Sequence, residues 1–142
     1  MTEICEIPAP KNRYLIDPVA FFAALVLAPL LIALLGFWLI LIPVFAVVMG
    51  GLPYLLAGGP LLANGLRYNE PSFYAFAGIG LLANMATPVL VFLFYIGNSQ
   101  PEAALNAAII YFGFGLIFAP LWCGVFAILY RKFRRELYSR PL

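Results

Sequence analysis

Three long segments without a charged side chain constrain this chain more than any other feature of its sequence. They span residues 18–66, 71–101 and 103–130. Of the 142 residues 65% are apolar and 10% are charged, and a soluble domain of this size cannot bury so much apolar surface. A bilayer core about 30 Å thick requires roughly 20 helical residues per crossing. The first segment is long enough for two crossings and the others for one each, which predicts four transmembrane helices.

The predicted fold is an all-α integral membrane protein with short loops, because the sequence lacks the strand alternation of a β-barrel. We expect a transmembrane domain at 18–130, with helices at about 18–38, 42–62, 72–96 and 102–130. Residues 1–17 mix acidic and basic side chains, and the apolar run after them is far longer than that of a secretory signal. We therefore expect the first helix to be retained.

The positions of the basic residues predict the orientation. With four crossings, all eight basic residues lie on one side of the membrane: Lys11, Arg13, Arg67, Arg131, Lys132, Arg134, Arg135 and Arg140. The positive-inside rule then assigns both the N-terminal tail (1–17) and the basic C-terminal tail (131–142) to the cytoplasm of a bacterial inner membrane. A juxtamembrane cluster this short favours anionic lipid headgroups over nucleic acid as its contact. The residues expected to make this contact are Arg131, Lys132, Arg134 and Arg135.

Glycines and prolines are concentrated in the second predicted helix, at Gly50, Gly51, Pro53, Gly58, Gly59 and Pro60. They indicate either a helix broken around a substrate site or a bent and capped helix. A re-entrant hairpin here would leave the basic residues divided between both sides, which the positive-inside rule disfavours. We therefore expect a kink at the first three residues and a C-cap at the last three, with 61–70 as a short interfacial piece.

Three helix starts carry capping signals. Asp17 can accept hydrogen bonds from the free amides of the first helix, and Pro18 suits its first position. Pro71 suits the first turn of the third helix in the same way. Ser99 and Glu102 have the spacing of a capping box ahead of the fourth helix.

Residues that carry chemistry are scarce. The chain has no histidine, which excludes histidine-ligated haem, chlorophyll and metals, and no ionisable side chain lies inside a predicted span. Cys5 and Cys123 are expected at different depths, so we predict no disulfide, and Cys123 has no catalytic base near it in sequence. We expect no cofactor, no metal site and no catalytic residue, and therefore no enzyme.

Asn84 and Thr87 form the one candidate polar site within a span. Asn84 could bind the carbonyl of a quinone, pigment or substrate. The interpretation we favour is structural: Asn84 bridges to a neighbouring helix or satisfies the carbonyl that Pro88 leaves free.

Small residues recur every four positions on two helices, and such faces let helices approach closely in lipid. The residues are Gly115, Ala119, Cys123 and Ala127 on the fourth helix, and Ala20, Ala24 and Ala28 on the first. They indicate packing inside the four-helix unit, or a face on which a partner docks.

Segment order and the phrase GGLPYLLAGGPLL, at 50–62, make the chain similar to small four-helix inner-membrane proteins of bacteria. The resemblance carries no catalytic motif and implies no site residue. We expect a non-catalytic accessory or scaffold subunit of a larger complex of respiratory or photosynthetic type, bound to lipids and to other integral membrane subunits. The alternative is a small homo-oligomeric transporter or channel for a neutral or apolar solute, with the kinked second helix lining the path. A water-filled cavity reaching Asn84, formed by unwinding of the helix at Gly50 and Gly51, would favour the alternative. A packed, dry interior with one helix face left bare would favour the subunit.

Overall fold

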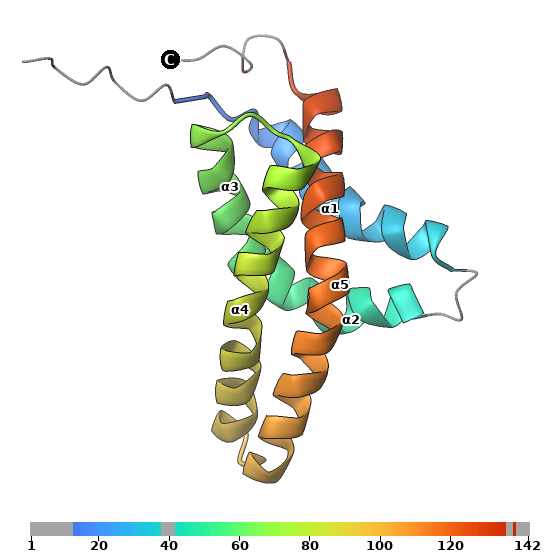
Figure 1. Cartoon of the computed structure of the whole chain (residues 1–142), viewed down its shortest axis with the longest axis vertical. Helices are drawn as coiled ribbons and strands as arrows, with labels where there is room; N and C mark the ends of the chain where they lie inside the picture. The colour runs from blue at the N-terminus through green and yellow to red at the C-terminus, as the bar shows by residue number, and fades with distance from the viewer. Residues whose placement is uncertain (1–12, 38–41, 136–137, 139–142) are drawn as a thin grey trace, which may run out of the picture.

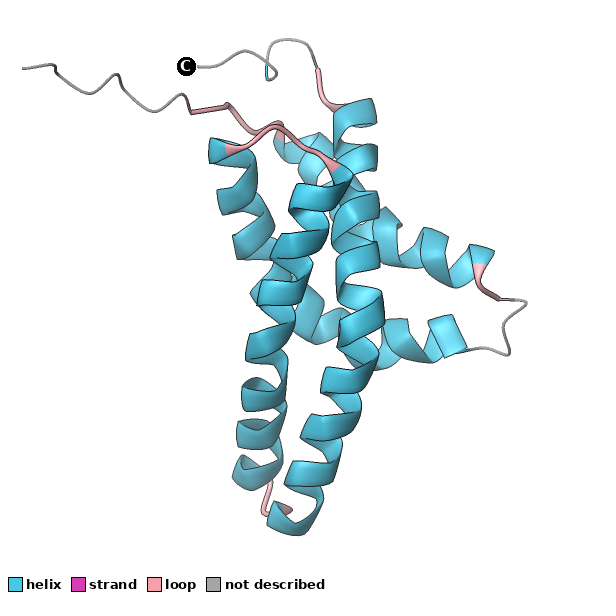
Figure 2. Cartoon of the chain, viewed as in Figure 1, coloured by secondary structure: helices cyan, strands magenta, loops and turns pink. Residues whose placement is uncertain are grey.

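The computed structural model describes residues 13–37, 42–135 and Tyr138, and within them the fold is all-helical (Figure 2). The elements are α1 (Pro18–Leu35), α2 (Ile42–Pro53), a π-helical segment η1 (Tyr54–Gly58), α3 (Gly59–Tyr68), α4 (Phe73–Gly97) and α5 (Pro101–Phe133). Four segments are long and apolar enough to cross a membrane, because α2, η1 and α3 follow one another without a break. They indicate a multi-pass membrane protein, as the charge-free runs predicted.

Two helical hairpins of different direction make up the molecule (Figure 1). The long helices α4 and α5 lie antiparallel along its full length. Helices α1 and α2 form a second hairpin, which crosses them obliquely, and α3 then returns beside α4. The start of α1 and the ends of α3 and α5 meet at one end of the molecule, where the Tyr14 amide donates to the Arg67 carbonyl (3.0 Å).

Asp17 caps α1 as the sequence predicted. Its Oδ1 accepts hydrogen bonds from the amides of Val19 (3.0 Å) and Ala20 (3.3 Å), and Pro18 occupies the first helical position. The same carboxylate is buried, with 3% of its residue surface exposed, and its Oδ2 accepts from the Arg135 amide (3.4 Å) just beyond α5. One side chain therefore both starts α1 and connects it to the end of α5.

The other two predicted helix starts are wrong in detail. Pro71 lies outside α4, whose N-cap is Ser72, with its Oγ accepting from the Ala75 amide (3.3 Å). The capping box is not formed, since the N-cap of α5 is Gln100 and makes no side-chain cap bond. Ser99 has a φ of 60°, the left-handed conformation. Because α4 continues to Gly97, only three residues connect it to α5. Ser99 lies in the turn that reverses the chain and therefore does not cap α5.

The predicted C-cap at Gly58, Gly59 and Pro60 is also wrong. Both glycines are helical, with φ values of −67° and −52°, and the Gly59 amide donates to the Tyr54 carbonyl five residues earlier. Pro60 has no N–H for the bond that an α-helix would form there. In lipid a helix end leaves backbone groups without partners, so one wider turn is less costly than a break. Residues 61–68 consequently continue the helix, and Figure 1 shows α2 and α3 running in different directions on either side of η1.

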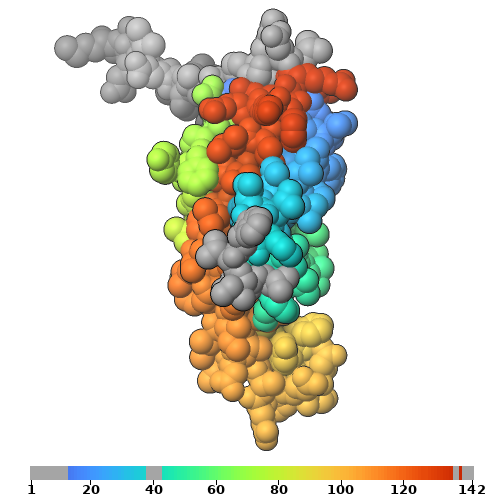
Figure 3. All heavy atoms as spheres, turned by 90° about the vertical axis from the view of Figure 1, so that its right-hand side faces the viewer, coloured from blue at the N-terminus to red at the C-terminus, as the bar shows by residue number. Residues whose placement is uncertain are grey.

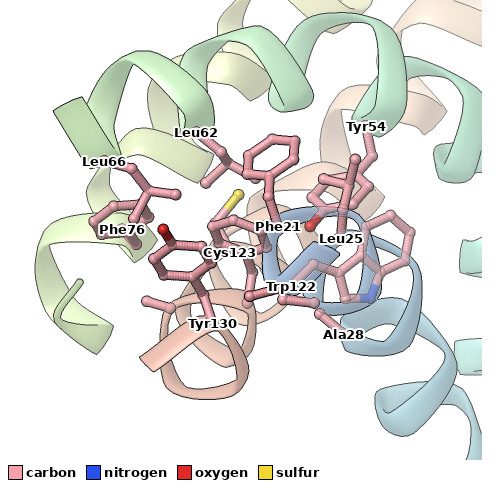
Figure 4. Packing of buried hydrophobic residues seen from close by; sticks show 14 of the residues in the cluster. Phe21, Leu25, Ala28, Tyr54, Leu62, Leu66, Phe76, Trp122, Cys123 and Tyr130 are labelled. Atoms are coloured by element: carbon pink, nitrogen blue, oxygen red, sulfur yellow. The ribbon is translucent and has the colours of Figure 1, made fainter. Parts of the chain in front are cut away.

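The buried core surrounds the basic-end half of α5 (Figure 4). Phe126 is its centre: its ring meets that of Phe21 from α1 edge-on, with centroids 5.4 Å apart, and stacks on that of Phe76 from α4 at 6.1 Å. Tyr54 from η1 and Trp122 from α5 extend the aromatic cluster toward α2.

The small-residue stripes pack inside this unit. Ala20, Ala24 and Ala28 of α1 are buried, as are Cys123 and Ala127 of α5, and all five belong to the same core. Gly115 and Ala119, further along the α5 stripe, are half-buried. A four-residue spacing of small residues is found both on faces that pack inside a protein and on faces that bind a partner. Here the neighbouring helices of the same chain cover the five buried residues.

Candidate functional site

A cavity of about 50 Å³ lies where α2, η1, α4 and α5 meet. Most of its wall is apolar. The polar side chains that line it are Tyr54, Asn84, Thr87, Tyr111, Trp122 and Cys123. Among the described residues these include both polar positions that the sequence singled out within a span, so this cavity is the candidate site.

Asn84 connects α4 to α5 at the wall of the cavity. It is 2% exposed, and its Nδ2 donates to the Phe112 carbonyl of α5 (3.2 Å). Gly115 stands directly opposite, and a Cβ at that position would overlap the Asn84 amide group. Gly115 therefore belongs to the small-residue stripe because the asparagine requires the space. Thr87 lies one turn further along α4 and lines the same cavity.

Tyr54 and Trp122 carry the two buried polar side-chain atoms that have no hydrogen-bond partner within the described part of the chain. These atoms are the Tyr54 Oη and the Trp122 Nε1, and the residues are 7% and 3% exposed. Their rings meet edge-on with centroids 5.3 Å apart, and Figure 4 shows both beside Cys123. Buried hydroxyl and indole N–H groups ordinarily find a partner.

The sequence pattern did not single out Tyr54 and Trp122. A signal was present: Tyr and Trp favour the membrane interfaces, where the polar tip stays wet, whereas both residues lie well inside predicted spans. The pattern alone does not reveal that η1 and α5 bring them together.

Two glycines of the second helix make room for these rings. A Cβ on Gly50 would lie 3.1 Å from the Trp122 ring, and one on Gly58 would lie 3.1 Å from the Tyr54 ring. By contrast, a Cβ on Gly51 would meet nothing within 4 Å. Gly50 lies within α2, so the cavity reaches Asn84 without any unwinding of the helix there.

An apolar groove of about 390 Å³ continues outward from the cavity, between α2 with η1 and the far halves of α4 and α5. Met49, Pro53 and Tyr111 line both spaces. The remaining residues of the groove are Val48, Leu52, Leu56, Leu90, Val91, Phe94 and Tyr95. The polar interior and the lipid-facing surface are thus adjacent along one wall.

The remaining predicted contacts involve the basic residues at the end of the molecule where α1 begins and α5 ends. Arg131 and Lys132 are exposed in the last turn of α5, and the Arg135 amide binds Asp17. The Arg13 guanidinium lies 6.0 Å from the ring centroid of Tyr68. Lys11, Arg140 and Cys5 fall outside the described residues. Within those residues no group of three His, Cys, Asp or Glu side chains could hold a metal ion, and Cys123 is a free, buried thiol.

Comparison with known proteins adds no assignment. No protein-family model matches the sequence, and neither a curated protein nor a solved structure matches the chain.

Proposed function

We propose that the protein is a non-catalytic subunit of a larger membrane assembly, held there by a partner protein that covers the turn between α1 and α2. The observation that supports this proposal is how far along the α4–α5 hairpin the end of α1 and the start of α2 lie. In Figure 1 the end of α1 and the start of α2 lie about halfway along the α4–α5 hairpin, and Figure 3 shows the far halves of α4 and α5 continuing well beyond them.

The sequence of α4 indicates how far the hydrocarbon extends. Its 25 residues span roughly 37 Å, slightly more than a bilayer core, and they are uncharged throughout. Leu93 and Phe94 are exposed near its far end, which suits lipid and not water. If α4 and α5 span the membrane, the end of α1 and the start of α2 lie deep within the hydrocarbon.

Helix ends at this depth require polar partners for their backbone groups. At the end of α1 the Ile32 and Leu34 carbonyls accept from the Gly36 and Phe37 amides. The first amides of α2 have no partner within their own helix. Lipid supplies none, and irregular backbone is tolerated at membrane depth only where protein or water covers it. Leu34 and Leu35, at the end of α1, are 71% and 76% exposed.

A second groove lies beside the turn and offers a place for the partner. It has a volume of about 420 Å³ and lies between α5 and the facing ends of α1 and α2. Its walls are formed by Ile32, Leu35, Gly36, Pro43, Ile117, Phe118 and Leu121. A transmembrane helix of another subunit that carries polar side chains at this level would fill the groove and satisfy the backbone.

The proposal also covers the membrane in which the protein lies and the side that its termini face. The assembly belongs to a bacterial inner membrane and is of respiratory or photosynthetic type. Both termini face the cytoplasm, with Arg131, Lys132, Arg134 and Arg135 on anionic headgroups. The segments 18–66, 71–101 and 103–130 carry no charged side chain, which suits a subunit that carries no ions.

The test is site-specific photo-crosslinking in the native membrane. A benzoylphenylalanine at position 35, beside the turn, should give one stoichiometric adduct with a different integral membrane protein. The same residue at position 105 of α5, where Leu105 is 61% exposed against 76% for Leu35, serves as the control and should give lipid adducts only. Purification in mild detergent should recover the same partner in one larger complex. Lipid adducts at both positions, with a homogeneous homo-oligomer in detergent, would refute the proposal.

A second candidate function is supported by the cavity at Asn84. A homo-oligomeric transporter or channel for a neutral solute would use this polar point within the membrane. Asn84→Leu should leave a scaffold subunit in its complex but abolish such transport, measured as solute flux into proteoliposomes.

A further inference from the structure

The segment before α1 and the end of α3 lie at the same end of the molecule (Figure 1), and a pocket of about 350 Å³ lies between them. The first segment contributes Arg13, Tyr14, Leu15 and Ile16 to its lining, and the last turn of α3 contributes Arg67. Both arginines are exposed. Two accessible guanidinium side chains from distant parts of the sequence therefore line one pocket.

Two contacts hold these segments together. The Tyr14 amide donates to the Arg67 carbonyl (3.0 Å). The Arg13 guanidinium lies 6.0 Å from the ring centroid of Tyr68, the last residue of α3, and an aromatic ring attracts a cation at this distance. A backbone bond and a ring contact thus bring the two arginines to the same pocket.

Neither arginine has a counter-charge in the part of the chain that the structure describes. No described carboxylate lines the pocket, and within residues 13–37 and 42–135 neither Arg13 nor Arg67 forms an ion pair. The Asp17 carboxylate is buried and accepts from backbone amides at the start of α1 and the end of α5. Glu70 lies beyond the end of α3 and is not part of the lining. The described lining therefore carries two positive charges and no negative one.

A doubly charged phosphate group matches this lining. Guanidinium groups stay ionised in proteins and bind phosphate oxygens through paired hydrogen bonds. A phosphate monoester carries about −1.5 to −2 charges at neutral pH, whereas a phosphodiester or a carboxylate carries a single one. The charge balance thus favours a monoester over both.

The level of the pocket favours a lipid as the carrier of that phosphate. Arg67 directly follows the charge-free segment 18–66, and Arg13 lies shortly before it. Basic residues in such positions lie where hydrocarbon meets the headgroups. Leu15, which is 45% exposed, adds apolar surface to the pocket wall and suits the first carbons of a lipid.

We propose that this pocket binds a doubly charged phosphate group, supplied by a lipid phosphomonoester such as phosphatidic acid. Arg13 and Arg67 bind the phosphate oxygens, and the acyl chains enter the bilayer beside Leu15. The site uses none of the residues at the end of α5 that are assigned to anionic headgroups. It also does not depend on a partner at the α1–α2 turn.

Native mass spectrometry of the purified protein, released from mild detergent, measures the Kd of the first bound lipid. The protein is titrated with three lipids that share the same dioleoyl chains, so any difference reports the headgroup. They are phosphatidic acid, a monoester; phosphatidylglycerol, a diester with one charge; and phosphatidylcholine, which has no net charge. We expect phosphatidic acid to bind roughly tenfold or more tightly than phosphatidylcholine, with phosphatidylglycerol between them.

Arg13→Gln and Arg67→Gln test the two guanidinium groups. Each should weaken binding of phosphatidic acid about fivefold, and the double variant should lose most of the preference over phosphatidylcholine. The matched control is Gln100→Glu with Ala103→Glu, which lowers the net charge by the same amount at the opposite end of the molecule. Both positions are exposed at the start of α5, where acidic side chains suit a helix N-terminus. This control should bind phosphatidic acid as the parent does, and thermal unfolding establishes that all variants are folded.

Inorganic phosphate distinguishes a lipid from a soluble source. It is titrated into the delipidated protein by calorimetry, at up to millimolar concentrations. Arginine-dependent binding of phosphatidic acid without binding of inorganic phosphate would assign the pocket to a lipid. Arginine-dependent binding of inorganic phosphate that phosphatidic acid does not displace would support the phosphate site and assign it to a soluble phosphate.

Three results would overturn the proposal. Equal binding of the three lipids, with no binding of inorganic phosphate, would mean that the pocket holds no phosphate. A preference for phosphatidic acid that survives the double arginine variant would place the headgroup elsewhere, at the end of α5. An equal loss in the control at the start of α5 would mean that the net charge of the protein, and not the pocket, attracts the lipid.

Discussion

Replacing Asp17 tests whether one carboxylate holds the basic end of the molecule together. Its Oδ1 accepts from the Val19 and Ala20 amides at 3.0 and 3.3 Å, and its Oδ2 accepts from the Arg135 amide at 3.4 Å. Asp17→Ala removes all three bonds, in a site that water does not reach freely.

The magnitude follows from these contacts. Loss of an N-cap typically costs about 1 kcal/mol. A buried amide that loses a charged acceptor costs roughly 1–3 kcal/mol, and the long, partly buried Arg135 contact belongs at the low end of that range. We therefore expect Asp17→Ala to lower the free energy of unfolding by about 2–3 kcal/mol. Asp17→Asn retains the cap oxygen and should lose about 1 kcal/mol.

The assay is equilibrium unfolding by SDS from mild-detergent micelles, followed by tryptophan fluorescence. Glu102→Ala is the matched control, since Glu102 is an exposed carboxylate in the first turn of α5 and carries no comparable buried contact. If Asp17→Ala destabilises the protein by no more than this control does, the carboxylate does not join α1 to α5 and the reasoning is refuted.

Two further substitutions test the close packing of the helices, in the same unfolding assay. Gly115→Ala would drive a methyl group into the Asn84 amide and should lower the free energy of unfolding by about 1–3 kcal/mol. Gly113→Ala is the control: a Cβ there meets nothing within 4 Å, so the substitution should be neutral or stabilise by up to about 1 kcal/mol. Ala127→Leu should reduce the folded fraction and not release a folded protein from a partner, because Ala127 is fully buried in the core; a stable, folded Ala127→Leu variant would contradict this packing.

The helix count was predictable because hydropathy and charge are properties of the local sequence. The charge-free runs predicted the number of crossings, and Asp17 followed by Pro18 predicted where α1 begins, since both signals act within a few residues. What the small-residue stripes pack against was not predictable. Ala24 and Ala127 follow the same spacing that an interface with a partner would show, and only the tertiary arrangement decides what covers them.

The candidate site illustrates the same limit. Asn84 stood out from its apolar run, but its contact with Phe112 depends on the register of α4 against α5. Tyr54 of η1 and Trp122 of α5 line one cavity and their rings meet edge-on, although 68 positions separate them in the chain. Neither local pattern nor composition determines this pairing.

The π-helical segment η1 is the clearest departure from the sequence prediction, and a pair of deletions tests its role. A π turn holds one residue more than an α turn, so deletion of Ala57 should convert η1 to α-helix while α2 and α3 keep their faces. Deletion of Ala63, within α3, should instead rotate the rest of the helix by about 100° and move Leu66 out of the core. We expect the Ala57 deletion to fold with a loss of about 1–2 kcal/mol, the scale of altered packing around one turn, and the Ala63 deletion to lose more than twice as much. If both deletions lowered the free energy of unfolding equally, the fold itself would require the extra residue of the π turn. In that case η1 would not be an insertion accommodated between Pro53 and Pro60.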